Sequence, residues 1–207
     1  LVVESAEVLG ADSLIPVESS HVDGCLYHGD SGVLYCEKLA ENGTQVKIPT
    51  TTNVGALNLS KLSQTKLSKE KRDMAYRLMK VHQEMGCVPT WTCAPYQAGA
   101  RPSFGQQVAW GESNAVAFTN SVLGARTNRY GDFLDIACAI SARAPYYGLH
   151  RSENRTAKLM LDVSNLSNKL LQEDAFFPVL GSMVGKLTGE TVSVVHGLPN
   201  NATEDQM

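Results

Sequence analysis

The sequence predicts an α/β fold, with a three-layer α/β/α arrangement around a mostly parallel sheet. Two observations support this prediction. Short apolar segments typical of buried strands alternate with segments of helical spacing, and several of the helical segments carry their own end signals. Strand–helix–strand units of this length favour right-handed crossovers, which make consecutive strands parallel. A chain of 207 residues is long enough for one large domain of this kind or for two small lobes.

The first elements alternate helix, strand and helix. Residues 1–9 have helical apolar spacing and stop before a glycine, and residues 13–19 (SLIPVES) are predicted as a short buried strand. Residues 31–43 (SGVLYCEKLAENG) predict an amphipathic helix, in which Ser31 is the expected N-cap and Gly43 the left-handed terminator.

The next elements lie on both sides of a polar connection. Residues 44–50 (TQVKIPT) are predicted as a strand, and residues 54–69 as a linker-like insertion. Residues 70–85 predict a helix, because four apolar side chains in that segment recur on one face. Residues 87–96 (CVPTWTCAPY) are predicted as a strand that runs into a proline-bounded loop.

The second half of the chain is expected to continue the same pattern. Its apolar spacing predicts helices over residues 115–123, 132–142 and 157–171. Residues 191–197 (TVSVVHG) are predicted as a late strand.

Composition disfavours several classes of function. The formal net charge is −3 and the Lys and Arg residues are scattered, so the sequence predicts no nucleic-acid partner. No apolar run approaches the roughly 20 residues of a membrane helix. The five cysteines lack CxxC spacing and no secretory signal precedes them, which favours free thiols in the cytoplasm. The start without Met and the polar tail suggest a piece of a longer chain.

Polar clusters follow three of the predicted strands and also fill the stretch WGESNAVAFTNSVLGARTNRYGD, residues 110–132. Loops at the carboxyl ends of parallel strands meet at one edge of a sheet, where α/β proteins bind ligands. The sequence therefore predicts a binding site built from these loops, and a small anion is one of the ligands that would satisfy their polar groups.

Each candidate residue has a structural alternative. Cys93 is either a metal ligand or nucleophile at a strand end, or a buried small apolar residue. Cys25 lies among polar residues between His21 and His28. Each of these two imidazoles is either an acid or base in catalysis, or a loop side chain whose hydrogen bonds are already made. Arg126 either captures a carboxylate or phosphate, or pairs with a neighbouring acid.

Five segments together resemble the aconitase X family, in the right order from about residue 10 to residue 200. They are ESSHVDG, PTTTNVGALNL, TCAPY, FGQQVAWGESNAVAFTNSVLGARTNR and RAPYYGLH. The resemblance implies hydro-lyases related to aconitase, with a large catalytic part and a smaller swivelling part that is fused or separate. It implies that residues 1–207 are a fragment of the large part, inactive alone, and that the swivelling part and later catalytic segments are absent.

The resemblance also implies an iron–sulfur cluster, [2Fe-2S] or [4Fe-4S], held by cysteines spread along the chain. Cys93 matches the motif cysteine and is the expected cluster ligand, with Cys25 as a weaker candidate. The base that removes the α-proton is Ser20, His21 or a serine in the missing half. The groups expected to bind the substrate are Glu112, Ser113, Asn114, Arg126, Thr127 and Asn128.

Two substrates are associated with the family, cis-3-hydroxy-L-proline and mevalonate 5-phosphate. The segments HVDGCLYHGD and TNRYGDFLD resemble the hydroxyproline type, and no Lys/Arg cluster surrounds the polar loops to receive a phosphate. Two rival interpretations are a non-catalytic half and an α/β module that binds an anion without iron.

Overall fold

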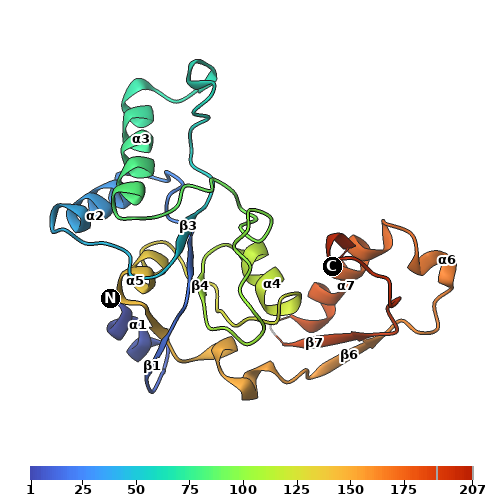
Figure 1. Cartoon of the computed structure of the whole chain (residues 1–207). Helices are drawn as coiled ribbons and strands as arrows, with labels where there is room; N and C mark the ends of the chain where they lie inside the picture. Colours follow the sequence, from blue (N-terminus) through green and yellow to red (C-terminus); the bar gives the residue numbers. More distant parts are fainter. Residues whose placement is uncertain (190, 207) are drawn as a thin grey trace. The chain divides into compact units, whose positions relative to one another are not determined.

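The computed structural model describes residues 1–189 and 191–206, which form two compact units (Figure 1). The first unit spans Leu1–His150 and the second begins at Arg151. Each unit has its own buried apolar clusters. All five cysteines are free thiols. Among the described residues, none of the helices is long and apolar enough to span a bilayer.

A small parallel sheet forms the centre of the first unit. Its strands are β2 (Ser20–Val22), β3 (Thr50–Thr52) and β4 (Ala109–Trp110), in the order β3-β2-β4. A separate antiparallel pair joins β1 (Leu14–Pro16) to β5 (Arg143–Pro145). The predicted α/β class is confirmed, but the parallel sheet is smaller than the sequence suggests and an antiparallel pair accompanies it.

Helices cover both faces of the parallel sheet. The five helices of this unit are α1 (Val2–Val8), α2 (Asp30–Glu41), α3 (Lys69–Glu84), α4 (Ser113–Ser121) and α5 (Leu134–Ser141). Val22 of β2 packs with residues of α2, α3 and α5, whereas Trp110 of β4 packs with Ala115 of α4. Because Ala109 packs beside α5, consecutive residues of β4 face opposite helical layers.

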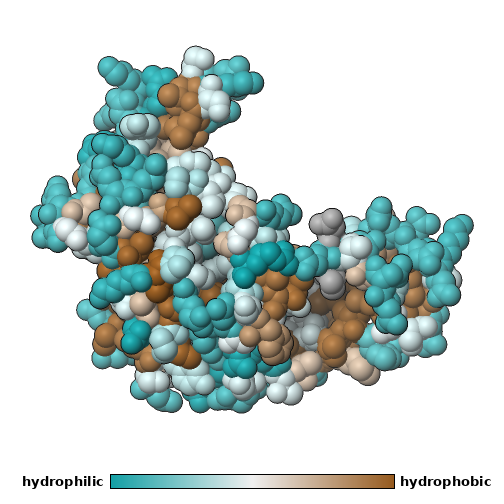
Figure 2. All heavy atoms as spheres, viewed as in Figure 1, coloured by the Kyte–Doolittle hydropathy of each residue, from teal (hydrophilic) through white to brown (hydrophobic). Residues whose placement is uncertain are grey.

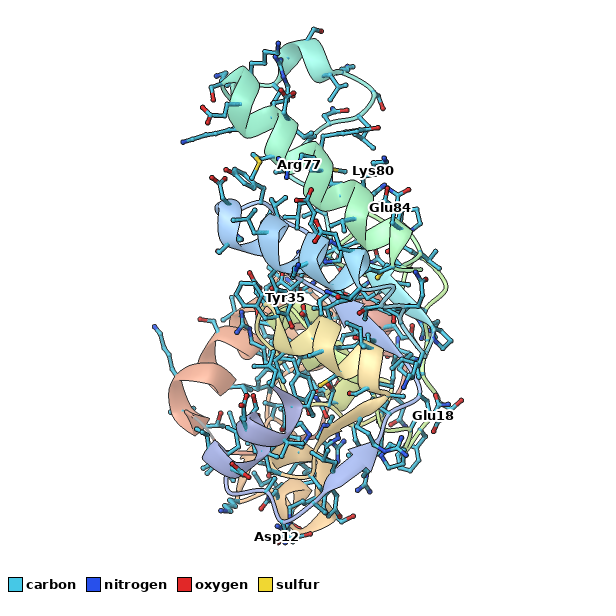
Figure 3. The ribbon with its side chains drawn as sticks, turned by 90° about the vertical axis from the view of Figure 1, so that its left-hand side faces the viewer. Asp12, Glu18, Tyr35, Arg77, Lys80 and Glu84 are labelled. Atoms are coloured by element: carbon cyan, nitrogen blue, oxygen red, sulfur yellow. The ribbon has the colours of Figure 1, made fainter. Side chains whose placement is uncertain are left out.

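Helices α2 and α3 pack side by side, and Figure 3 shows Tyr35 on α2 and Arg77 on α3. Ser68 caps α3 by accepting a hydrogen bond from the Lys71 backbone N–H at 3.3 Å. Arg77 holds Glu37 through two N–H donors at 2.8 and 2.6 Å. In Figure 2 the surface over α2 and α3 is mainly hydrophilic, as expected for helices with one buried face.

The second unit combines a parallel strand pair with two helices. Strand β6 (Leu159–Asp162) pairs with β7 (Ser193–His196). Helices α6 (Asn168–Leu171) and α7 (Phe176–Thr188) contribute most of its core, which includes Phe176, Phe177 and Leu180. Short 3-10 turns lie at Leu62–Gln64 and Gly148–His150 in the first unit and at Ser152–Arg155 and Glu204–Gln206 in the second.

Several sequence predictions are confirmed within one to three residues. These are the helices expected at 1–9, 31–43, 70–85, 115–123 and 132–142, together with the late strand at 191–197. Gly43 has φ +71° just beyond α2, as expected of a left-handed terminator. The N-cap of α2 is Gly29, so the assignment of Ser31 was wrong.

Three segments were predicted wrongly. Residues 157–171 form β6 and the short α6 instead of one helix, because a brief apolar run satisfies helical and strand spacing equally. In residues 44–50 the ladder begins only at Thr50, since Val46 and Ile48 pack against the core without a partner strand. Residues 87–96 form no regular strand, and Val88 makes an isolated bridge to Thr51.

Candidate active site

The carboxyl ends of β2, β3 and β4 lead directly into a cluster of polar side chains. Asp23 follows β2, Asn53 follows β3, and Gly111 and Glu112 follow β4. A Cβ atom on Gly111 would lie 2.8 Å from the Asp23 Cβ and 3.1 Å from its backbone nitrogen. Only glycine therefore allows these two loops to approach so closely.

Asn53 is the centre of this cluster and is buried. Its Nδ2 donates to Asp23 Oδ1 at 2.5 Å, which fixes the amide so that Oδ1 faces the opposite way. Oδ1 accepts from the Cys93 thiol at 3.2 Å and from the Val54 backbone N–H. One amide thus joins the loops that follow β2 and β3 to the segment that carries Cys93.

Cys93 is the one cysteine of the five that is not buried. Its backbone carbonyl accepts from Asn114 Nδ2 at 2.7 Å, so the first turn of α4 fixes its main chain while Asn53 fixes its sulfur. Partial burial raises the pKa of the Cys93 thiol, and the nearby Glu112 carboxyl adds to the rise. The thiol is accessible and held from two sides.

Glu112 has three features that an ordinary surface carboxylate lacks. Its φ of +61° is in the left-handed region, it is the N-cap residue of α4, and its Oε2 is enclosed without a hydrogen-bond partner in the described residues. Burial raises the pKa of Glu112, with Asp23 adding to the effect through its charge. Backbone strain and an unpaired buried oxygen are typical of residues selected for function.

Asp135, in the first turn of α5, supports the loop that carries Asp23. Its carboxylate is fully buried and accepts from the backbone N–H groups of Asp23 (2.7 Å), Gly24 (3.3 Å) and Ile136 (2.6 Å). Burial raises the pKa of Asp135 to about 7, although these three donors favour the charged form.

The structure places the two predicted catalytic residues, Ser20 and His21, beneath the polar edge. The Ser20 hydroxyl donates to the Ala109 carbonyl at 2.7 Å, inside the sheet. His21 is buried, its Nδ1 lies 2.8 Å from Thr51 Oγ1, and its Nε2 has no partner in the described residues. Burial lowers the pKa of His21 to about 4, so the ring is neutral at physiological pH.

Cys25 lies in the core rather than at the edge. Its thiol donates to the backbone carbonyl of Asn53 at 3.2 Å and faces that of Val22 at 3.7 Å. Burial raises the pKa of Cys25 strongly. Cys25 is therefore a buried thiol whose hydrogen-bond contacts are backbone carbonyls, an environment typical of a structural cysteine.

The six predicted substrate-binding residues separate into two groups. Glu112, Ser113 and Asn114 lie at the carboxyl edge near Cys93. Arg126 lies beside Gln107, on the amino side of β4, and its guanidinium donates to the His150 carbonyl at 3.2 Å.

Thr127 and Asn128 secure the segment that follows Arg126. Thr127 Oγ1 accepts from the Trp110 backbone N–H at 3.1 Å, and Asn128 donates to the Tyr147 carbonyl at 3.0 Å. The structure does not bring these two side chains or Arg126 to Cys93.

Sequence reasoning missed Asn53 and Asp135 as parts of the site. Asn53 directly follows the TTT segment that became β3, and a polar residue after a buried parallel strand was the signal available. Asp135 was hidden inside a predicted amphipathic helix, where an acidic residue in the first turn normally has only a capping role.

The described residues include one accessible thiol, that of Cys93, which could serve as a ligand of a metal cluster. No group of three or more His, Cys, Asp or Glu side chains in residues 1–189 and 191–206 is arranged to hold a metal ion. Cys93 fits the role of a single ligand because its thiol is accessible and is held in place by Asn53. A complete cluster requires further ligands from outside these residues.

Comparison with known proteins gives a concordant result. The family model described as "Aconitase X first domain" matches residues 1–153. A cis-3-hydroxy-L-proline dehydratase of Pseudomonas aeruginosa is 38% identical over 96% of this chain and 34% of its own length. The phosphomevalonate dehydratase large subunit of Thermococcus kodakarensis is 35% identical over 99% of this chain and 50% of its own.

A solved structure agrees with the sequence relatives. The crystal structure of Thermococcus kodakaraensis aconitase X in its holo-form is similar to this chain with a TM-score of 0.82 and 35% identity, covering 98% of this chain and 50% of that one. The chain therefore spans between a third and a half of the length of these relatives.

Proposed function

The chain belongs to the aconitase X family, and from this premise we propose that it is part of the large catalytic portion of a hydro-lyase. The substrate is a small β-hydroxy carboxylate, and an iron–sulfur cluster is the cofactor. The observation that carries the proposal is the accessible Cys93 thiol, held by Asn53 and Asn114 at the carboxyl edge of the parallel sheet.

In this proposal the cluster, when bound, supplies a Lewis-acidic iron for the departing hydroxyl. Cys93 is its ligand from this chain, and the Asp23–Asn53 pair sets the position of the Cys93 sulfur. Gly111 keeps the loops after β2 and β4 close enough to exclude water between them.

The base belongs, in this proposal, to the portion of the enzyme beyond residues 1–207. Ser20 uses its hydroxyl inside the sheet, and a neutral His21 with a pKa near 4 is a weak base for a carbon-bound proton. Of the three alternatives that the sequence left open, burial therefore disfavours the two in this chain.

For the substrate we propose cis-3-hydroxy-L-proline, with mevalonate 5-phosphate as the alternative. The dehydratases of both substrates are similar to this chain at nearly the same identity, so relatedness alone does not decide. The carboxylates of Asp23 and Glu112 lie together at the edge, and this charge disfavours a phosphate dianion beside them.

We also propose a partner of the swivelling kind, as a second domain or a second subunit. The relatives from archaea are named large subunits, which implies a smaller one in those proteins. Closure of such a partner over Cys93 would complete the site with the groups that this chain lacks.

The test is turnover of cis-3-hydroxy-L-proline by the full-length protein after anaerobic reconstitution with iron and sulfide, beside a Cys93→Ser variant. Turnover that is lost together with the visible cluster absorption in the variant supports the proposal. Turnover of mevalonate 5-phosphate and not of cis-3-hydroxy-L-proline would show that mevalonate 5-phosphate is the substrate. Activity in the variant at the parent rate would contradict the role of Cys93.

A further inference from the structure

Two arginines that lie three residues apart in sequence, Arg126 and Arg129, occupy opposite ends of β4. Arg126 forms a parallel bridge with Gln107, and its carbonyl accepts from the Val108 backbone N–H at 2.9 Å. Farther along, the Tyr130 backbone N–H donates to the Trp110 carbonyl at 3.3 Å. The chain therefore runs beside β4 toward the carboxyl edge and reaches it at Arg129.

Helix α4 fixes this path from its other side. The Ala125 backbone N–H donates to the Thr119 carbonyl at 3.0 Å, and the Asn120 amide donates to the Thr127 carbonyl at 2.9 Å. Both contacts lie at the C-terminal end of α4. Because the segment continues in the opposite direction to the helix, Arg129 lies toward the end of α4 that begins with Ser113.

The alternation of side chains indicates which face Arg129 occupies. Tyr130 is buried in the cluster that contains Ala109 and Cys138, on the α5 face of the sheet. In extended backbone the preceding side chain points to the opposite face, where Trp110 packs beneath α4. That is the face on which the Cys93 main chain meets Asn114 of α4.

Arg129 is exposed, and in the part of the chain that the structure describes its guanidinium has no hydrogen bond or ion pair. The neighbouring edge is acidic, since Asp23 and Glu112 lie there. The carboxylates of Asp23 and Glu112 would repel an anion, so an uncommitted guanidinium at this edge is the group that can bind an anionic part of the substrate.

We infer that Arg129 binds the carboxylate of the substrate, an inference that rests on the proposed hydro-lyase function. Removal of the α-proton places negative charge that is shared with this carboxylate. A guanidinium that grips both oxygens therefore binds the substrate and also stabilises the charge that develops during elimination. Sequence reasoning assigned the binding of an anionic substrate group to Arg126, and we assign it to Arg129 instead.

The experiment compares Arg129→Gln and Arg129→Lys with Arg143→Lys in the reconstituted full-length protein. Arg143 is an exposed arginine of β5 that donates to the Ala142 carbonyl, and it serves as the matched control. Loss of a charge-assisted contact should lower kcat/KM by on the order of tenfold to a hundredfold in Arg129→Gln, and less in Arg129→Lys. The control should match the parent, and cluster absorption should be equal in all four proteins.

Competition by two probes separates carboxylate recognition from a general loss of function. L-Proline carries the carboxylate and L-prolinamide replaces it with a neutral amide. The parent should bind L-proline more tightly, and Arg129→Gln should lose that preference. A preference that survives in Arg129→Gln, or equal weakening of both probes, would overturn the inference while leaving hydroxyproline turnover by the parent intact.

A different outcome would concern the proposed substrate alone. If the parent protein turned over mevalonate 5-phosphate and not hydroxyproline, the substrate assignment would fail. The inference would still be tested, because mevalonate 5-phosphate also carries a carboxylate. Its kcat/KM should then fall in Arg129→Gln by the same order, and an unchanged value would overturn the inference.

Discussion

The two ends of the parallel sheet differ in how they use polar residues. Toward the amino end a closed set of hydrogen bonds joins His150 and Gln107 to the hydroxyl of Tyr130, whose backbone lies at the carboxyl end. The Tyr130 hydroxyl donates to His150 Nε2 at 2.5 Å, and His150 Nδ1 donates to Gln107 Oε1 at 2.6 Å. At the carboxyl end, Glu112 and His21 each keep an enclosed atom without a partner in the described residues.

The polar side chains of the amino end therefore contribute to stability, whereas those of the carboxyl end are candidates for binding and catalysis. At the amino end the side chains of Tyr130, His150 and Gln107 satisfy one another's hydrogen bonds, which leaves none of these three groups for a ligand. The carboxyl end retains unpaired buried oxygen and nitrogen atoms and a strained Glu112 backbone, which cost free energy and are therefore retained where function requires them. Substitutions at the two ends should therefore have different kinds of effect.

The largest effect is expected from Asn53→Ala at the carboxyl end. The variant removes the amide that holds the Cys93 sulfur and leaves Asp23 without its donor. We expect the reconstituted full-length protein to lose most of its iron and its visible absorption. Iron and sulfide analysis is the measurement, with Asn114→Ala, which spares the sulfur contact, as the milder comparison. Full iron content in Asn53→Ala would show that Cys93 needs no such support.

At the amino end, His150→Ala should reduce stability without changing chemistry. It leaves the buried Tyr130 hydroxyl and the Gln107 side chain without their partner and creates a cavity, at a cost of about 2–4 kcal/mol in free energy of unfolding. Denaturant titration measures this loss. Turnover per folded molecule should equal that of the parent. A fall in kcat without loss of stability would show that the amino end also contributes to catalysis.

Asp135 gives the carboxyl end a pH-dependent stability. Its pKa in the folded protein is raised to about 7, above its ordinary value of 3.8, so between these values the folded state binds more protons than the unfolded state. Stability should therefore be highest near pH 4 and fall as pH rises to 7, by up to about 1.4 kcal/mol per pH unit. Denaturant titrations between pH 4 and 8 should show this slope in the parent and a flatter one in Asp135→Asn. Equal slopes would mean that Asp135 is charged throughout.

Most helices could be predicted because their periodicity is local, but the strands of the central three-stranded parallel sheet could not. Ser20–Val22 reads as a polar loop, and only its two partner strands make His21 a buried residue. The general position of the site could be predicted from the sequence, because polar residues that follow parallel strands meet at one edge of the sheet. The separation of Arg126 from Cys93 could not be predicted from the sequence. It depends on how residues 126–130 align beside β4, which places Arg126 at the amino end of that strand.

The smallest effect is expected from Arg126→Lys, and it tests the comparison most directly. Sequence reasoning assigned this arginine to the substrate, whereas the structure places its guanidinium against the His150 carbonyl at the amino end. Lysine retains the charge but not the planar fork, so the free energy of unfolding should fall by about 1 kcal/mol. The KM should stay within about twofold of the parent value, since the expected loss belongs to the scaffold. Thermal unfolding and steady-state kinetics of the full-length protein give the two quantities. A raised KM with unchanged stability would show that Arg126 contributes to substrate binding, and that both ends of the sheet take part in it.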